Sequence, residues 1–190
     1  METFLLVGLG NPGKRHENNR HNVGFMVLDA VAAASSCSFK KVASVADVAV
    51  CAVGDRRIIL SKPLTYMNLS GNAVRFLSDF YKIPVDDVCV CHDDVDLHSG
   101  RVKIKKGGGS GGHNGLRSID SLMGDGYWRL RIGVGRPPEK SMMTAHVLGD
   151  FSEEDGNILR KIIASLAENV DLLFLDRQKL EMQLNSLSDG

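Results

Sequence analysis

Short apolar runs alternate along this chain with segments whose apolar residues recur every three or four positions. Runs of the first kind are typical of buried strands, and segments of the second kind are typical of amphipathic helices. Strands are predicted at Phe4–Val7, Val45–Val53, Arg57–Leu60, Val88–Cys91, Lys103–Lys105 and Leu130–Val134. Helices are predicted from Ser70 to about Lys82, at Asn114–Met123 and around Ile158–Leu173. Because the two kinds of segment are intermixed throughout, the pattern predicts a single α/β domain.

The pattern also indicates how the sheet is arranged. Val45–Val53 and Arg57–Leu60 flank a turn at Gly54 and Asp55, which predicts an antiparallel hairpin. We therefore expect a twisted, mixed and mostly parallel sheet with helices on both faces. We expect the domain to span residues 1–184, and residues 185–190 to form a frayed C-terminal tail.

Composition is that of a soluble globular protein. The chain has 190 residues, of which 43% are hydrophobic and 24% are charged, and this length allows a substantial core. No apolar run approaches the roughly 20 residues of a membrane span. The chain does not open with the basic and apolar regions of a secretory signal, so we expect a cytoplasmic protein.

The formal net charge is zero, but the charges are unevenly distributed. Basic residues dominate from Arg101 to Arg136, and acidic residues dominate from Asp150 onward. A basic face beside a glycine-rich loop can bind phosphates even in a neutral protein. The alternative is an ordinary solvated surface, which is the usual explanation of a charge run.

None of the cysteine pairs has the spacing of a zinc finger or of a Cys-x-x-Cys motif. Cys89 and Cys91 lie two positions apart in a predicted strand, so both face the same side. We expect them to be buried free thiols. A metal site at Cys91, His92 and Asp93 is the alternative, but its ligand set is incomplete.

Candidate chemistry gathers where the first strand ends. Asn11 follows Phe4–Val7 in a turn rich in Gly and Pro, and His21 comes shortly after it. Open α/β sheets place their ligand sites at such strand ends. An imidazole can take a proton from water near neutral pH, so His21 is a candidate general base. The alternative is a histidine that only makes a local hydrogen bond at a helix start.

Asp93 follows the predicted strand Val88–Cys91 and is expected at the same edge of the sheet. A carboxylate there can accept the second ring N–H of His21, fix its tautomer and stabilise the imidazolium. Asp94 and Asp96 are rivals for this role. The alternative for the whole acidic cluster is a turn cap or a cation site.

Three asparagines, Asn11, Asn68 and Asn114, follow three separate apolar elements. Converging neutral amides can bind a peptide backbone and the 3′ end of an RNA, and one of them can donate to a developing oxyanion. Each alone is better explained by turn chemistry, but three together beside His21 favour a binding site. Tyr66 either stacks near the substrate or packs half-buried.

Five motifs follow one another along the chain. They are GLGNPG with RHNVG at the start, TYMNLSG at 65–71, HDDVDL at 92–97, GGGSGGHNGL at 107–116 and RLRIGVG at 129–135. In this order they resemble bacterial-type peptidyl-tRNA hydrolases. Each motif alone is weak, whereas the ordered set is specific. The resemblance covers nearly the whole chain and weakens after about Phe151.

The resemblance implies a monomeric enzyme that hydrolyses the ester between a peptide and the 3′-terminal ribose of tRNA. Water would be the nucleophile, and no cofactor or metal would be needed. His21 matches the catalytic histidine of the family, and Asp93 matches its partner. The three asparagines and Tyr66 would hold the substrate, and Asn11 would distinguish N-blocked from free aminoacyl groups.

Two further features follow from the resemblance, and a third follows from the glycine-rich loop itself. Lys105 and Arg131 match the family's clamp for the 5′ phosphate of tRNA, with simple strand-surface charge as the alternative. His16 stands where the family usually has tyrosine, and its imidazole can still stack on a base or bond a phosphate. Gly107–Gly112 is not a P-loop, because no Lys-Ser/Thr pair follows it. By analogy with the lids of other enzymes, we predict a mobile gate there.

Two other functions stay open. Gly8, Gly10 and Gly13 match the spacing of a dinucleotide-binding fingerprint with Asp29 downstream, which suggests an oxidoreductase. However, Pro12 removes an N–H where pyrophosphate needs donors, and no amphipathic helix follows Gly13 directly. The second is a non-catalytic RNA-binding protein of the same fold, which the complete set of histidine, aspartate and asparagines opposes.

Overall fold

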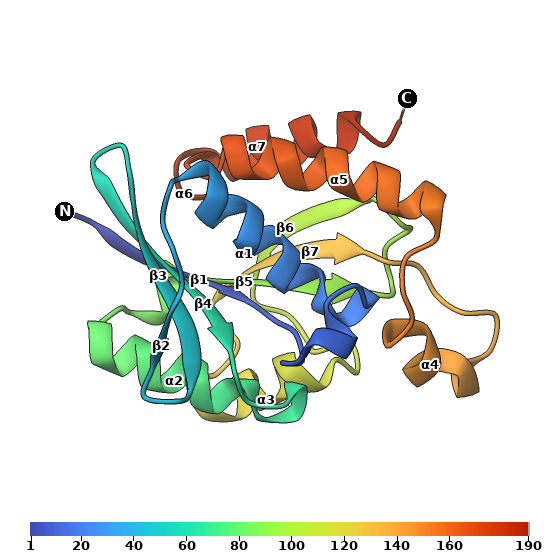
Figure 1. The fold of residues 1–190 in the computed structure, drawn as a ribbon, viewed down its shortest axis with the longest axis horizontal. Helices are drawn as coiled ribbons and strands as arrows, with labels where there is room; N and C mark the ends of the chain where they lie inside the picture. Colours follow the sequence, from blue (N-terminus) through green and yellow to red (C-terminus); the bar gives the residue numbers. More distant parts are fainter. Residues whose placement is uncertain (190) are drawn as a thin grey trace.

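A sheet of seven strands organises the computed structural model, which describes residues 1–189 (Figure 1). Its strands run in the order β2-β3-β4-β1-β5-β7-β6. Their bounds are β1 Thr3–Gly8, β2 Lys40–Val42, β3 Ala46–Val53, β4 Arg56–Pro63, β5 Val88–Asp94, β6 Val102–Lys106 and β7 Trp128–Gly133. The central strands β4, β1, β5 and β7 pair in parallel, and β2–β3, β3–β4 and β6–β7 are antiparallel. The predicted mixed sheet and hairpin are confirmed, with the parallel pairings confined to the centre.

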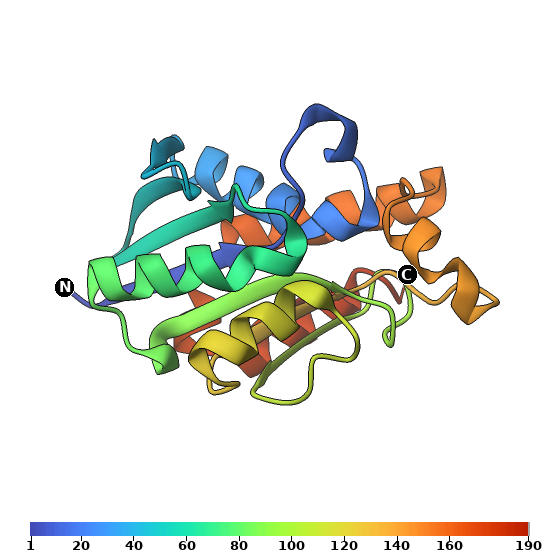
Figure 2. The same cartoon turned by 90° about the horizontal axis from the view of Figure 1, so that it is seen from below.

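Helices cover both faces of the sheet, as predicted. One face carries α1 Val23–Ala34, α5 Glu153–Glu168, α6 Leu172–Leu175 and α7 Arg177–Ser186, and the other carries α2 Ser70–Tyr81 and α3 Asn114–Met123 (Figure 1). The short α4 Met143–Val147 lies beyond the strand ends (Figure 2). Single-turn 3₁₀ helices occur at η1 Lys14–His16, η2 Arg20–Asn22, η3 Met67–Leu69, η4 Val85–Asp87 and η5 Lys140–Met142.

The central strands are buried on both faces, which explains why their sequences are almost continuously apolar. On β1, Leu6 packs toward α1 and Leu5 packs toward α2. On β5, Cys89 and Cys91 lie in the α1 layer as buried free thiols, as predicted. Burial raises the pKa of Cys89 to about 12, so the thiol stays neutral.

The C-terminal segment differs from the prediction. The expected helix around Ile158–Leu173 is divided into α5 and α6, and α7 continues through Ser186. Asn185 is buried in α7, where it accepts a hydrogen bond from the N–H of Val102 at 2.8 Å and donates one to its C=O at 2.9 Å. The expected tail boundary at residue 185 is therefore wrong. The Asn185 side chain pairs with backbone N–H and C=O groups at the edge strand β6, which would otherwise lack a partner strand. Gly190, the last residue of that tail, lies outside the described residues.

A close contact between two glycines brings the start of α1 against the sheet. A Cβ on Gly8 would lie 2.3 Å from the carbonyl oxygen of Gly24, and a Cβ on Gly24 would lie 2.4 Å from the nitrogen of Leu9 and 2.6 Å from the carbonyl oxygen of Cys91. Only glycines allow backbones to approach this closely. The contact holds the segment that contains His21 next to the end of β5.

Candidate active site

A cavity of about 950 Å³ opens where β1, β4, β5 and β7 end. It is lined by the predicted residues Asn11, His21, Tyr66, Asn68, Asp93, Lys105, Asn114 and Arg131. His16 is not among the lining residues, and it lies half-buried in η1, where it accepts a hydrogen bond from Arg15 Nε at 3.1 Å. The fold therefore brings together every predicted site residue except His16.

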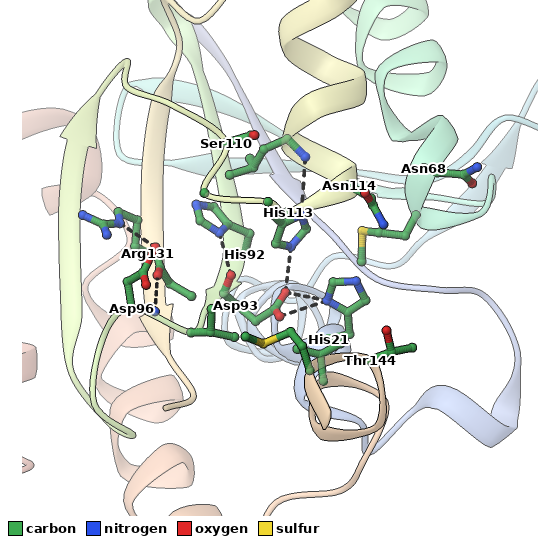
Figure 3. A pocket seen from close by; sticks show the side chains of 18 of the residues that line it. His21, Asn68, His92, Asp93, Asp96, Ser110, His113, Asn114, Arg131 and Thr144 are labelled. Atoms are coloured by element: carbon green, nitrogen blue, oxygen red, sulfur yellow. Dashed lines mark hydrogen bonds and ion pairs between the residues drawn. The ribbon is translucent and has the colours of Figure 1, made fainter. Parts of the chain in front are cut away.

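Asp93 is a buried carboxylate that bonds His21. The Nδ1 of His21 lies 2.9 Å from both carboxylate oxygens (Figure 3). Burial alone would raise the pKa of Asp93, but the charge and hydrogen bond of His113 and the hydrogen bond and charge of His21 hold that pKa well below its ordinary value. Asp93 is thus an anion that the two imidazoles stabilise.

His113 is a cavity-lining residue that the sequence analysis missed. It caps α3, and its Nδ1 accepts hydrogen bonds from the N–H groups of Gly115 at 3.1 Å and Leu116 at 3.4 Å. The proton of the neutral ring is therefore on Nε2, which donates to Asp93 Oδ1 at 2.8 Å. The available signal was its place just before a predicted helix, although histidine is not a usual N-cap residue.

The bond to Asp93 also fixes the tautomer of His21. Because the ionised carboxylate only accepts hydrogen bonds, the His21 proton resides on Nδ1. The lone pair is then on Nε2, which points away from Asp93 (Figure 3) and has no hydrogen-bond partner within residues 1–189. An imidazole held in this way can accept a proton from a molecule in the cavity.

The two rival carboxylates have other partners. Asp94 accepts hydrogen bonds from Arg131 Nε at 2.7 Å and from the N–H of Asp96 at 2.9 Å. Asp96 in turn accepts one from Arg136 Nε at 3.0 Å. Asp94 and Asp96 thus shape the turn after β5 and bind arginines, and among the three carboxylates only Asp93 contacts His21.

His92 is neutral and faces the floor of the cavity. It lies 2% exposed, and its Nδ1 donates to the carbonyl oxygen of Asp93 at 2.8 Å. Burial, and then the neighbouring His113, lower the pKa of His92 to about 4. A ring that resists protonation in this way does not compete with His21 as a base.

The alternative metal site at Cys91, His92 and Asp93 is not formed. Cys91 points into the core beneath α1, whereas His92 lines the cavity. His21, Asp93 and His113 do offer three ligand atoms within 4.8 Å of one another. However, the two histidine–aspartate hydrogen bonds already use the atoms that a metal would need.

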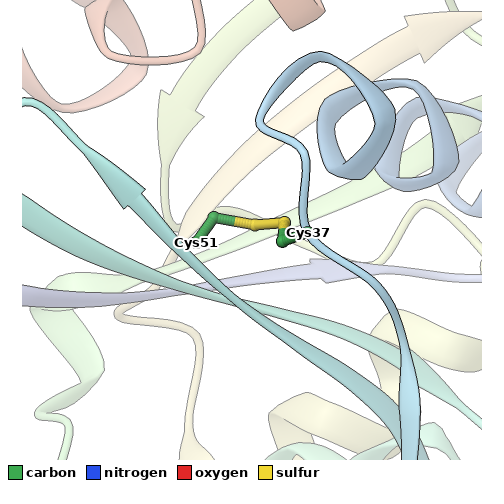
Figure 4. Close-up of a disulfide and its surroundings, with 2 residues drawn as sticks. All are labelled: Cys37 and Cys51. Carbon is green, nitrogen blue, oxygen red and sulfur yellow. A yellow bond between two sulfur atoms is a disulfide. The ribbon is translucent and has the colours of Figure 1, made fainter.

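The other two cysteines form a disulfide that the sequence analysis did not predict. Cys37, in the segment after α1, is bonded to Cys51 on β3, 14 positions away (Figure 4). Neither cysteine lines the cavity. The bond joins the outer part of the sheet to the segment that follows α1.

The amide of Asn11 is oriented by the backbone around it. Its Oδ1 accepts a hydrogen bond from the N–H of Met67 at 2.9 Å, so its Nδ2 is the group left for a ligand. Asn22, another residue not predicted, accepts from the N–H of Asn11 and donates to its C=O, both at 2.9 Å. Asn68 and Asn114 are exposed at the cavity wall. The three amides converge on one cavity, and Asn11 presents a donor to it.

The two predicted clamp residues differ in their surroundings. Lys105 is exposed on β6, and its ammonium lies so close to the glycine-rich loop that a Cβ on Gly108 would be 2.7 Å from it. Arg131 is partly neutralised by Asp94, because one edge of its guanidinium is bonded to that carboxylate. Both line the same cavity, and Lys105 offers the more available positive charge.

A short helix forms the wall opposite the glycine-rich loop. Met143, Thr144 and Val147 of α4 line the cavity there. Arg20 donates to the carbonyl oxygen of His146 at 3.1 Å, and the N–H of Arg20 donates to that of Gly149 at 2.9 Å. The residue that precedes His21 therefore also holds this wall.

A family model described as peptidyl-tRNA hydrolase matches residues 5–189. This chain belongs to the peptidyl-tRNA hydrolase family. Its curated relatives include a peptidyl-tRNA hydrolase from Chelativorans sp. that is 47% identical over 185 residues, which cover 97% of this chain and 77% of the relative. A second, from Anaplasma marginale, is 50% identical over 172 residues, which cover 88% of this chain and 91% of the relative.

Solved structures agree with this assignment. The crystal structure of a peptidyl-tRNA hydrolase from Acinetobacter baumannii matches with a TM-score of 0.90 and 34% identity, over 96% of this chain and 94% of that chain. The peptidyl-tRNA hydrolase fold thus accounts for the mixed sheet and its helices. Within residues 1–189, no helix has both the length and the hydrophobicity to cross a membrane.

Membership of the peptidyl-tRNA hydrolase family removes the oxidoreductase alternative. The local structure gives the physical reason, because β1 is followed by a loop and the single turn η1 instead of a long helix. A pyrophosphate needs the aligned N–H groups of a helix N-terminus at this point. The spacing of Gly8, Gly10 and Gly13 instead serves the contact with α1 and the turn that carries Asn11.

The lowered pKa of Asp93 predicts how stability depends on pH. A carboxyl whose folded pKa lies below its ordinary value of about 3.9 adds stability that is present above that pH and is lost as the pH falls toward the folded pKa. The unfolding free energy should therefore fall more steeply below about pH 4 in the unaltered protein than in Asp93→Asn. Urea unfolding at several pH values measures this slope. The exposed Asp55→Asn serves as control and should behave as the unaltered protein, and equal slopes for all three proteins would contradict the account of Asp93.

Proposed function

We propose that this protein hydrolyses the ester bond between an N-blocked aminoacyl or peptidyl group and the 3′-terminal ribose of tRNA. The products are free tRNA and a free peptide. The observation that carries the proposal is His21, whose Nδ1 is bonded to a buried carboxylate and whose Nε2 is open to a cavity lined by three amides. Family membership supplies the substrate class.

His21 provides the base for this reaction. Its Nε2 takes a proton from water as the oxygen attacks the ester carbonyl, and the anionic Asp93 stabilises the imidazolium that forms. Amide donors of the cavity meet the negative charge on the carbonyl oxygen, and we assign this role to Asn68 or Asn114, which both line the cavity. As the carbon–oxygen bond breaks, the imidazolium returns the proton to the leaving 3′ oxygen of the ribose.

Asn11 accounts for a preference for N-blocked substrates. Because its Oδ1 is bonded to Met67, its Nδ2 presents N–H donors, which suit the carbonyl of an acyl or peptide group. A free α-ammonium also has only donors, so it leaves that amide unpaired. The donor on Asn11 therefore selects against free aminoacyl-tRNA.

The tRNA body meets the basic side of the cavity. Lys105 and Arg131 lie on neighbouring antiparallel strands and both line the cavity, which suits a 5′ phosphate. His16 lies outside the cavity lining, and we propose that it contacts the tRNA beyond the ester. The proposal includes a cytoplasmic location, a monomeric protein and a gate at Gly107–Gly112 that opens and closes in microseconds to milliseconds, more slowly than the motions that NMR order parameters report.

Hydrolysis of N-acetyl-aminoacyl-tRNA tests the proposal directly. Since the proposed reaction uses only His21, Asp93 and amides, free tRNA should appear at an undiminished rate after dialysis against a chelator. Acid gels resolve charged from free tRNA under single-turnover conditions. The alternative of a non-catalytic RNA-binding protein requires tRNA binding without ester cleavage. Activity that is lost on chelation and restored by zinc would refute the metal-free mechanism.

Substitutions at the carboxylates test the assignment of the base and its partner. His21→Ala should lower the single-turnover rate by about 10²–10⁴-fold, the usual worth of general-base assistance. Asp93→Asn should lower it less, with tRNA affinity nearly unchanged, because Asp93 orients the base and stabilises its charge. Asp94→Asn is the matched control. A larger loss for Asp94→Asn than for Asp93→Asn would show that the wrong carboxylate has been assigned.

Asn11→Asp tests the selectivity. The unaltered protein should cleave free aminoacyl-tRNA about tenfold more slowly or worse, in line with the loss of one hydrogen bond. An aspartate can still accept from Met67, but its second oxygen attracts an ammonium and repels a carbonyl. The difference between the two substrates should therefore shrink in Asn11→Asp. Equal cleavage of both substrates by the unaltered protein would refute the role of Asn11.

Salt dependence tests the clamp. A plot of the logarithm of the tRNA binding constant against the logarithm of the salt concentration should become less steep in Lys105→Gln. The slope should change by about 0.7 to 0.9, the effect of one lost phosphate contact. Hydrolysis of a minimal nucleoside ester should be spared. Lys106→Gln is the control, because Lys106 is adjacent on β6 but pairs with Asp86. The clamp assignment is wrong if both variants flatten the slope equally or if the minimal ester suffers as much as tRNA.

A further inference from the structure

Arg129 is a buried cation that the proposed reaction does not use. It lies on β7 and is 2% exposed. Burying a guanidinium is costly unless its donors are paired. The partners of Arg129 therefore indicate why it occupies this place at the cavity floor.

Those partners connect α3 to the glycine-rich loop. The Nη1 of Arg129 donates to the carbonyl oxygen of Gly109 at 2.6 Å, and its Nη2 donates to Asp120 Oδ1 on α3 at 3.1 Å. The hydroxyl of Tyr127 donates to the same carboxylate oxygen at 2.6 Å, and the guanidinium lies 4.8 Å from the centre of the Tyr127 ring. One terminal nitrogen of Arg129 is thus hydrogen-bonded to α3, and the other is hydrogen-bonded to the loop.

The loop has few other attachments. The N–H of Gly107 bonds the carbonyl oxygen of Tyr127 at 3.0 Å where the loop begins, and the N–H of His113 bonds that of Ser110 at 3.0 Å where it ends. A Cβ on Gly109 would meet nothing within 4 Å, so the loop is open around Gly109, while the side chain of Lys105 lies beside Gly108. Within residues 1–189, Arg129 provides the hydrogen bond from the rest of the protein to that middle part.

The loop leads directly to the residue that holds Asp93. Ser110 and His113 close one turn, and His113 bonds Asp93 at 2.8 Å. We propose that Arg129 is a positioning residue that holds Gly107–Gly112 over the ester site and keeps His113 in register with Asp93. The kinetic consequences of this inference rest on the proposed function, whereas the tethering of the loop by Arg129 does not depend on it.

Loss of this hydrogen bond has a defined consequence for the reaction. Without this hydrogen bond, only a fraction of the molecules has the loop closed over the ester site. The apparent affinity for substrate is reduced by that fraction. Bound substrate restores the closed arrangement, so turnover at saturation is nearly retained. The effect concerns the ester site, so it is independent of the tRNA body and of salt.

Backbone NMR and kinetics of Arg129→Met and Tyr127→Phe test the inference. Arg129→Met should lower the order parameters of residues 108–112 from about 0.8 to below about 0.6. It should raise KM about tenfold for both N-acetyl-aminoacyl-tRNA and a minimal ester without a 5′ phosphate, with kcat changed by less than about twofold. Tyr127→Phe removes a buried hydrogen bond of the same network but leaves the loop bonded. It should be less stable yet unchanged in loop order and KM.

Several results would overturn the inference. Equal order parameters for the loop in Arg129→Met and in the unaltered protein contradict the tether, as do order parameters that already lie below about 0.6 in the unaltered protein. A flatter salt dependence of tRNA binding with the minimal ester spared would show that Arg129 contacts a phosphate instead. If Arg129→Met does not fold, Arg129→Lys decides, because a single ammonium does not reproduce the two separate nitrogens, Nη1 and Nη2, that bond Gly109 and Asp120, and loop order should still fall. If the unaltered protein cleaves no ester, the proposed function fails, while the order parameters still test the tether.

Discussion

The active site depends on one buried carboxylate that two histidines share. Asp93 is 2% exposed, and an anion with so little water around it needs charge-assisted hydrogen bonds. His21 and His113 supply them, and His113 is itself fixed by the N–H groups at the start of α3. The backbone N–H groups at the start of α3 therefore fix the tautomer of His113, and the carboxylate of Asp93 fixes the tautomer of His21. Its consequence is that His21 presents an unprotonated Nε2 to the cavity, which is what a base for water requires.

The fold supplies this arrangement by bringing the ends of β5 and β1 and the start of α1 together. Asp93 lies at the end of β5, and Asn11 follows β1. The glycine contact between β1 and α1 brings His21 within reach of Asp93. Parallel pairing of the central strands places their carboxyl ends at one edge of the sheet. The open edge of β6, by contrast, is satisfied by side chains of α7, so that the C-terminal segment stabilises the sheet at some distance from the chemistry.

Sequence reasoning succeeded where a local pattern determines the outcome. All the strands except β2, together with α2, α3 and the hairpin, follow from apolar runs and turns. The rule that sites lie at strand ends brings His21 near the acidic cluster after β5, and the family resemblance selects Asp93 from that cluster. Sequence reasoning failed where the role of a residue depends on a contact with a distant segment of the chain. His113 lies between glycines that suggested only a loop, and the disulfide of Cys37 with Cys51 joins separate elements. Asn185 looked like part of a polar tail, because no local pattern shows that its amide completes an edge strand. The roles of the site residues, in contrast to their positions, remain predictions.

The protonation of the two imidazoles tests the central claim most directly. Long-range ¹H–¹⁵N NMR spectra of the protein at a pH where both rings are neutral distinguish a protonated Nδ1 from a protonated Nε2. The account predicts that His21 carries its proton on Nδ1 and that His113 carries its proton on Nε2, both donated to Asp93. A His21 ring with its proton on Nε2 would leave no lone pair facing the cavity and would contradict the account.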